Sequence, residues 1–174
     1  MNYKPLGLAV LLTAFAASAL AQTQISGTIR CGKGDPFQSQ SIEVGDQAGH
    51  MLVIDKASCP WNVPFEIAGL KSTSISYAES IDLTGAKFQA RGYGVITMDN
   101  GDKAYVHYQG AGTMNDGAPV SGEGTWSFAG GTGKLKGLKG KGTNKASRTQ
   151  SGEGEQKVEG EYSLPEPAAA AKKK

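Results

Sequence analysis

One carboxylate in the chain is placed where it could do acid–base chemistry. The residues from 71 to 82 fall into two alternating rows, and Glu79 shares its row with Thr73, Ile75, Tyr77 and Ile81. Alternate residues of a strand lie on one face of the sheet, so a regular strand would hold Glu79 among apolar side chains. Burial raises the pKa of a carboxyl group, which can then act as a general acid or base. If the strand instead ends near Tyr77, Glu79 lies at the rim of the sheet and has no such role.

A second set of residues could hold a flat, apolar ligand. These residues are uncharged, and most are aromatic: Tyr108, Trp126, Phe128, Asn144 and Tyr162. Large rings opposite missing side chains can leave a slot, in which hydroxyl groups, the indole N–H group and an amide orient the ligand. The alternative is that the rings simply fill the interior of a small barrel.

The two cysteines form the only pair available for a disulfide. Cys31 and Cys59 would close a loop of 29 residues, counting both ends. In an exported protein such a pair is expected to be oxidised. A reactive thiol at Cys59 is the alternative, but the chain has no C-x-x-C motif to support it.

Other chemistries lack the residues that they need. The chain has two histidines and no H-x-x-x-H motif, so we expect no metal site. The glycines of the 130–133 segment are not followed by the G-K-[ST] of a phosphate-binding loop, and no G-x-S-x-G elbow is present. We therefore expect no cofactor, and a binding protein rather than an enzyme.

The elements that position these residues are strands. Five segments between 87 and 164 alternate with period two, and one row of each holds the glycines: nine in all, with no charged residue. The opposite rows hold ten charged residues and no glycine. Because the charged rows must meet water, the glycine rows point inward, where missing side chains allow a sheet to curl. The pattern predicts an all-β fold: one closed antiparallel barrel of about eight strands.

The first half of the chain is less regular. Ile25, Gly27, Ile29 and Cys31 repeat the inward pattern. The residues from 50 to 54 are apolar on both faces, which predicts a strand covered on its outside by a loop, a helix or another subunit.

The segment from Gly124 to Thr143, GTWSFAGGTGKLKGLKGKGT, carries a family resemblance. It resembles the glycine signature of the allene oxide cyclase and dirigent barrel superfamily, and more closely small exported bacterial proteins of that type, most of unknown function. The resemblance implies an eight-stranded barrel of calycin shape, often trimeric. Plant members guide cyclisation or radical coupling in the barrel without a cofactor. Their catalytic residues lie outside this signature, so the resemblance bears on the fold and not on the activity.

The two ends of the chain are not part of the predicted barrel domain, which covers residues 22–164. Residues 1–21 combine an early lysine, an apolar stretch and Ala-Leu-Ala, which is typical of a cleaved signal peptide. The mature protein is therefore predicted to be periplasmic or secreted, with no transmembrane anchor. Residues 165–174, rich in Ala and Lys, are predicted to be a disordered tail.

Three functions follow from these observations. The preferred one is binding of a small hydrophobic or aromatic molecule in the barrel. The second is a cofactor-free isomerase or cyclase that uses Glu79 with a tyrosine. The third is a structural or envelope-surface binding protein that uses residues 134–148, which hold six Lys and Arg and no acid. No aromatic residues alternate with these lysines, so we expect no nucleic-acid partner.

Overall fold

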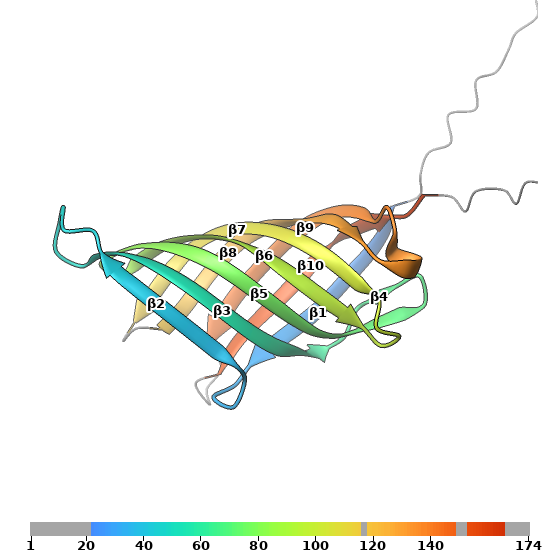
Figure 1. The fold of residues 1–174 in the computed structure, drawn as a ribbon, viewed down its shortest axis with the longest axis horizontal. Coiled ribbons are helices and arrows are strands. Elements are labelled where there is room, and N and C mark those ends of the chain that lie inside the picture. Colours follow the sequence, from blue (N-terminus) through green and yellow to red (C-terminus); the bar gives the residue numbers. More distant parts are fainter. Residues whose placement is uncertain (1–21, 116–117, 149–152, 166–174) are drawn as a thin grey trace, which may run out of the picture.

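The structure is a computed structural model that describes residues 22–115, 118–148 and 153–165. Within this part of the chain there is no α-helix, and nearly every segment is a strand (Figure 1). In chain order the elements are β1 (Thr23–Cys31), β2 (Phe37–Glu43), β3 (His50–Val63), β4 (Glu66–Ile67), β5 (Leu70–Thr84), β6 (Lys87–Met98), β7 (Lys103–Asn115), β8 (Ala118–Gly131), the 3-10 turn η1 (Gly133–Leu135), β9 (Lys139–Arg148) and β10 (Gly154–Ser163).

Eight of these strands close into an antiparallel barrel. The sheet runs β3-β1-β10-β9-β8-β7-β6-β5, and β3 also pairs with β5, which completes the ring. β2 and β1 both pair with the same edge of β3. β2 pairs with the first half of β3, and β1 pairs with the last residues of β3. The predicted closed barrel of about eight strands is confirmed.

The facing of the strands follows the glycine rows. Val106 and Trp126 on the inner rows are buried, whereas Lys103, Glu123 and Lys141 on the outer rows are exposed. Strand β5 departs from the predicted pattern, because a bulge lies between Ser72 and Ser74. The bulge buries Ser72 and leaves Thr73 exposed, so the prediction of Thr73 on the inward row was wrong.

The inward glycines make room for rings from neighbouring strands. A Cβ atom on Gly142 would lie 2.5 Å from Cζ2 of Trp126, and one on Gly160 would collide with the same atom. A Cβ atom on Gly27 would lie 2.9 Å from Cζ3 of Trp61. Besides curling of the sheet, these glycines therefore allow the indole rings to pack against backbone that carries no side chain.

One end of the barrel is plugged. Leu135 of η1 and Leu138, three residues further along the chain, are fully buried there. Ile67 of β4 is also fully buried, and Phe65 and Leu70 beside it are nearly so. In Figure 1, η1 and β4 lie at the same end of the barrel. Within the part of the chain that the structure describes, these side chains close this end of the lumen.

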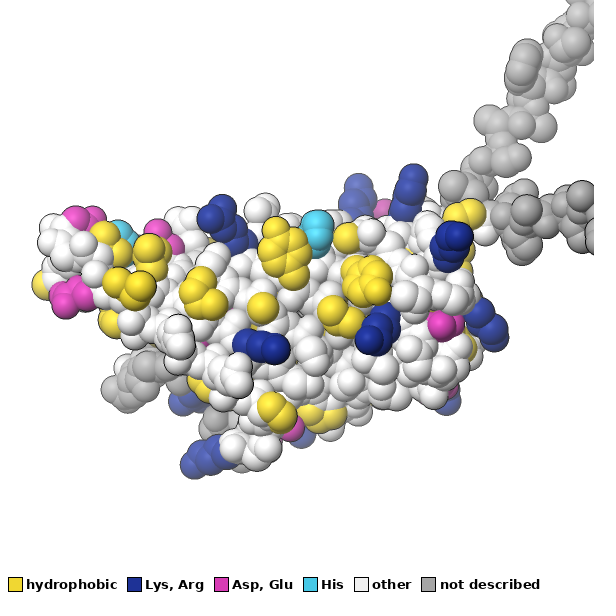
Figure 2. Space-filling view, in the orientation of Figure 1, with side chains coloured by type: hydrophobic (Ala, Val, Ile, Leu, Met, Phe, Trp, Pro, Cys, Tyr) yellow, Lys and Arg dark blue, Asp and Glu magenta, His cyan; other side chains and the backbone are white. Residues whose placement is uncertain are grey.

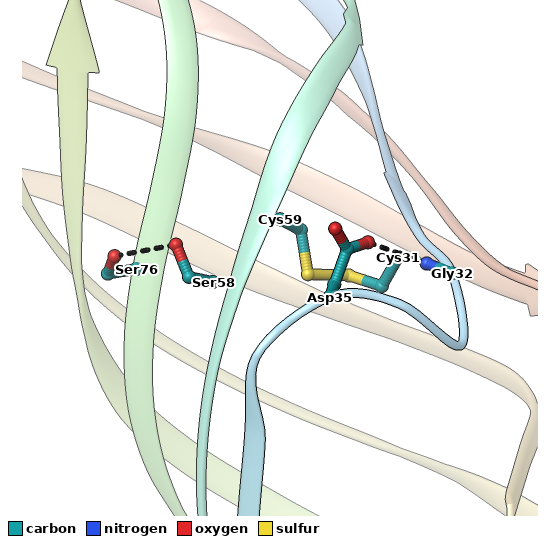
Figure 3. The surroundings of a disulfide bond; sticks show 6 residues. All are labelled: Cys31, Gly32, Asp35, Ser58, Cys59 and Ser76. Atoms are coloured by element: carbon teal, nitrogen blue, oxygen red, sulfur yellow. Dashed lines mark hydrogen bonds between the residues drawn. A yellow bond between two sulfur atoms is a disulfide. The ribbon is translucent and has the colours of Figure 1, made fainter.

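The seam between β1 and β3 is the shortest in the barrel. The two strands pair only at Thr28 with Val63 and at Ile29 with Trp61, with a register shift between them. The Cys31–Cys59 disulfide crosses this seam (Figure 3), which confirms the predicted bridge. On the other side of β3, the Ser58 and Ser76 hydroxyls are hydrogen-bonded at 3.0 Å, which links β3 to β5.

The outer face of the β2–β3 hairpin is apolar and uncovered. Ile42 is 73% exposed, Ile54 60% and Leu52 49%. Figure 2 shows hydrophobic side chains on this face, over β2, β3, β5 and β6. The prediction that a loop or a helix covers this strand was wrong within the described residues. Cover by another subunit, and the trimer that the resemblance implies, stay predictions.

Candidate functional site in the barrel lumen

The barrel holds a cavity of about 430 Å³. Its walls are mainly apolar, and its mouth is formed by the 32–37 segment together with the ends of β9 and β10. The mouth carries charges of both signs: Lys33, Asp35, Arg148, Glu153 and Glu155. A volume of this order is typical of pockets for small organic molecules. The rings therefore do not fill the barrel completely.

Glu79 faces this cavity from the middle of β5. The bulge near Ser74 precedes it, and the strand then runs regularly to Thr84, so Glu79 shares the inner face with Tyr77 and Ile81. The alternative in which the strand ends near Tyr77 was wrong.

Tyr108 on β7 reaches Glu79 across the strand that separates them. Its hydroxyl group donates a hydrogen bond to Oε2 of Glu79 at 3.2 Å. Gly92 on β6 lies between the two residues in the register. A Cβ atom on Gly92 would lie 2.5 Å from the Tyr108 hydroxyl oxygen, so only glycine leaves room for this contact. The sequence identified both residues but gave no signal that they touch.

The environment of Glu79 favours its neutral form. Burial raises the pKa of Glu79 to about 7; the hydrogen bond from Tyr108 opposes this, and the carboxylate of Asp55 adds to it. Burial likewise raises the pKa values of the Tyr77 and Tyr108 hydroxyl groups, with a further contribution from the charge of Glu79. Near neutral pH Glu79 therefore exchanges its proton readily, whereas both tyrosines remain protonated.

Asp55 is a functional candidate that sequence reasoning missed. It lies directly opposite Glu79 in the β3–β5 register. Its Oδ1 atom is buried and has no hydrogen-bond partner among the described residues. Asp55 follows the doubly apolar run from 50 to 54, and counting back in twos from Cys59 would have placed it on the inner face.

The aromatic wall of the cavity is formed by strands other than β3 and β5, which carry the two acids. Trp126 and Phe128 contact each other with ring centroids 4.9 Å apart, and both line the cavity together with Phe88, which the sequence analysis did not single out. The indole N–H of Trp126 donates to the backbone oxygen of Thr143 at 3.1 Å, so it is already used and does not orient a ligand as predicted. The indole nitrogen of Trp61 is buried without a partner among the described residues.

Of the five predicted ligand-binding residues, four line the cavity and one does not. Asn144 lines the cavity, as do Tyr108, Trp126 and Phe128. Tyr162 does not: its hydroxyl oxygen accepts a hydrogen bond from the backbone N–H of Ala68 at 3.3 Å. The ring is thus held by the segment between β4 and β5, near the plugged end. Its inward facing was predicted, but its height in the barrel was not.

The basic segment from 134 to 148 does not form an isolated patch. On the outer face, Lys141 of β9 lies opposite Glu161 of β10, and Lys145 lies opposite Glu123 of β8. An open hollow of about 770 Å³ on this outer wall is lined by Lys141, Glu159 and Glu161 among other polar residues. Acidic neighbours reduce the field that an anionic surface would meet. The structure therefore adds no support for the envelope-binding hypothesis.

Comparison with known proteins adds no assignment. Among the described residues, no group of His, Cys, Asp and Glu side chains could hold a metal ion, and no helix is long and apolar enough to span a membrane. The predicted signal peptide and residues 166–174 of the predicted tail lie outside the described residues. No family model and no curated protein matches the chain, so the resemblance of the Gly124–Thr143 segment to the allene oxide cyclase and dirigent superfamily stays a prediction.

Proposed function

We propose that this protein binds a small hydrophobic or aromatic molecule in the lumen of its barrel. The observation that carries the proposal is the open cavity of about 430 Å³, walled by the rings of Tyr108, Trp126 and Phe128. Glycine keeps this apolar surface free of side chains. Binding is favourable when a ligand replaces the water on such a surface. The disulfide is typical of an oxidising compartment and supports the proposal that this binding takes place after export.

Uptake of a neutral dye tests this proposal. Titration with N-phenyl-1-naphthylamine should give a saturable fluorescence increase with one site per chain, displaced by 3-methylindole. Trp126→Leu should weaken binding about fivefold, since a buried aromatic pair contributes roughly 1 kcal/mol. Tyr93→Leu is the matched control, because Tyr93 is an aromatic residue that is 68% exposed on the outside of β6. The proposal is wrong if the dye shows no saturable uptake, or if both variants bind it equally well.

A second candidate function is proton transfer by a cofactor-free isomerase. The hydrogen bond between Tyr108 and Glu79 favours it, because the pair places a carboxyl group with a pKa of about 7 beside a phenol in a cavity. Glu79 would remove a proton from carbon next to a carbonyl group and return it elsewhere, while a tyrosine hydroxyl donates to the carbonyl oxygen. Membership of the allene oxide cyclase and dirigent superfamily, which we propose alongside it, bears on the barrel fold and not on this activity.

Isomerisation of a β,γ-unsaturated cyclic ketone in D₂O tests the second candidate. The wild type should accelerate the shift of the double bond and incorporate deuterium. Glu79→Gln should lower the rate by about a hundredfold or more, the usual contribution of a general base. Glu159→Gln, on the exposed face of β10, should leave the rate unchanged. Equal rates for all three proteins would exclude this function.

A further inference from the structure

We propose that the ligand of the lumen is cationic: a small apolar body that carries a protonated amine, which pairs with the carboxylate of Glu79. This inference rests on the proposed binding function and names the chemical class of its ligand. It is carried by the position of two carboxylates on the inner face, opposite an aromatic wall.

The two carboxyl groups lie on neighbouring strands, and no described cation lies beside either of them. Asp55 and Glu79 are directly opposed in the register of β3 and β5. Neither forms an ion pair with any of the described residues. A buried carboxylate without a counter-ion is costly, and two together repel each other. Glu79 lines the cavity and Asp55 does not, so an ammonium group that enters would pair with Glu79 and would also be attracted by the charge of Asp55 opposite it.

The groups that face Glu79 from each neighbouring strand leave it without a counter-charge. On β3 the facing residue is the acid Asp55, on β6 it is Gly92, and on β7 it is Tyr108. Tyr77 on its own strand is neutral. The two basic residues that line the cavity, Lys33 and Arg148, lie at the mouth, together with the acids of the 32–37 and 153–155 segments. The inner wall is therefore negative or neutral but never positive.

The aromatic rings suit the same ligand class. Tyr77 and Tyr108 meet edge to face with centroids 6.4 Å apart, and both line the cavity beside Glu79. Ring faces attract cations, most strongly where water is excluded. The apolar walls formed by Trp126 and Phe128 would contact the uncharged body. An anionic ligand of the same shape would meet like charge, which excludes it.

Three indoles with the same ring system test the charge of the ligand. They are tryptamine, 3-methylindole and indole-3-propionate, which are a cation, a neutral molecule and an anion at pH 8. Calorimetric titration should show tryptamine binding about tenfold more tightly than 3-methylindole, and indole-3-propionate binding more weakly than either. Glu79→Gln should remove the preference, so that tryptamine binds no more tightly than 3-methylindole. Asp55→Asn should reduce the preference without removing it.

The pH dependence of the wild type provides a test that needs no variant. Only ionised Glu79 pairs with an amine, and with a pKa of about 7 its ionised fraction rises about tenfold between pH 6 and pH 8. The affinity for tryptamine should therefore rise about tenfold over this range, whereas that for 3-methylindole should stay constant. Tryptamine itself remains protonated throughout, as other alkyl amines do.

The outcomes separate this inference from the function on which it rests. If 3-methylindole and the neutral dye fail to bind, the binding function itself is wrong. If they bind but tryptamine shows no preference and no rise with pH, the lumen is a neutral apolar site and the cationic ligand is overturned. A preference for tryptamine that survives Glu79→Gln would also overturn it, because the cation would then pair elsewhere.

Discussion

Replacing Glu79 by glutamine should stabilise the protein at neutral and higher pH. The raised pKa of Glu79, about 7 against an ordinary value of 4.5, means that the folded protein holds this proton more tightly than the unfolded chain. The stabilising effect of the protonated form is fully present below pH 4.5 and is lost as pH rises through 7. Glutamine cannot ionise, so at pH 8 the variant should exceed the wild type by as much as about 3 kcal/mol in free energy of unfolding.

Urea denaturation at pH 5 and pH 8 measures this effect. At pH 5 the two proteins should differ by less than about 1 kcal/mol, since Glu79 is still protonated in the folded state and only the unfolded chain has begun to ionise. The neutral carboxyl group and the amide have similar shapes and can both accept the hydrogen bond from Tyr108. Glu159→Gln on the exposed face of β10 should show no comparable gain at pH 8. A Glu79→Gln curve that runs parallel to the wild type from pH 5 to pH 8 would show that Glu79 is ionised normally, and the electrostatic basis of the site would be lost.

The same burial connects stability with function in this barrel. A buried carboxyl group that is costly to ionise lowers the stability of the folded protein when it is ionised. The same burial suits it for binding a cation or for moving a proton. Gly92 belongs to the same arrangement, because its missing side chain lets Tyr108 lie over β6 and reach Glu79. Strand β6 thus contributes to the site through the absence of a side chain.

The fold could be predicted from the sequence because the barrel repeats one simple rule. Period two fixes which residues share a face, and the glycine rows and charged rows of β6 to β10 identify the inner face. The same rule placed Trp126, Phe128 and Asn144 on the cavity wall. It failed at Thr73, where one extra residue in a bulge reverses the facing and no local signal marks the bulge.

The contacts within the site could not be predicted, because they depend on register and on position along the barrel axis. Alternation gives the facing of Tyr162 but not its height, and the height places it at the plugged end rather than in the cavity. Asp55 was missed because the run from 50 to 54 before it is apolar on both faces, so alternation there did not identify the inner row. In the structure β3 alternates regularly, with Leu52 and Ile54 on the exposed row.

Removing the disulfide should destabilise the barrel by between about 3 and 4 kcal/mol, because the unfolded chain gains the entropy that a closed loop of 29 residues had denied it. The Cys31→Ala, Cys59→Ala double variant measures it without leaving a free thiol. The loss should be concentrated at one seam, because β1 and β3 pair at only two positions, whereas β8 and β9 pair at seven.

Hydrogen exchange should therefore accelerate in β1 and at the end of β3, and stay slow in β6 and β7, which pair over eleven positions. Both cysteines line the cavity, so the opened seam also lets water into the lumen from the side, and uptake of the neutral dye should weaken in the double variant. Wild-type protein treated with a reductant is the matched control and should reproduce both effects. A loss below about 1 kcal/mol, or exchange that accelerates equally in all strands, would mean that backbone pairing and core packing alone hold the seam shut. In that case the disulfide would be a consequence of barrel closure, whereas a local loss at β1 and β3 would make it the covalent substitute for the hydrogen bonds that this seam lacks.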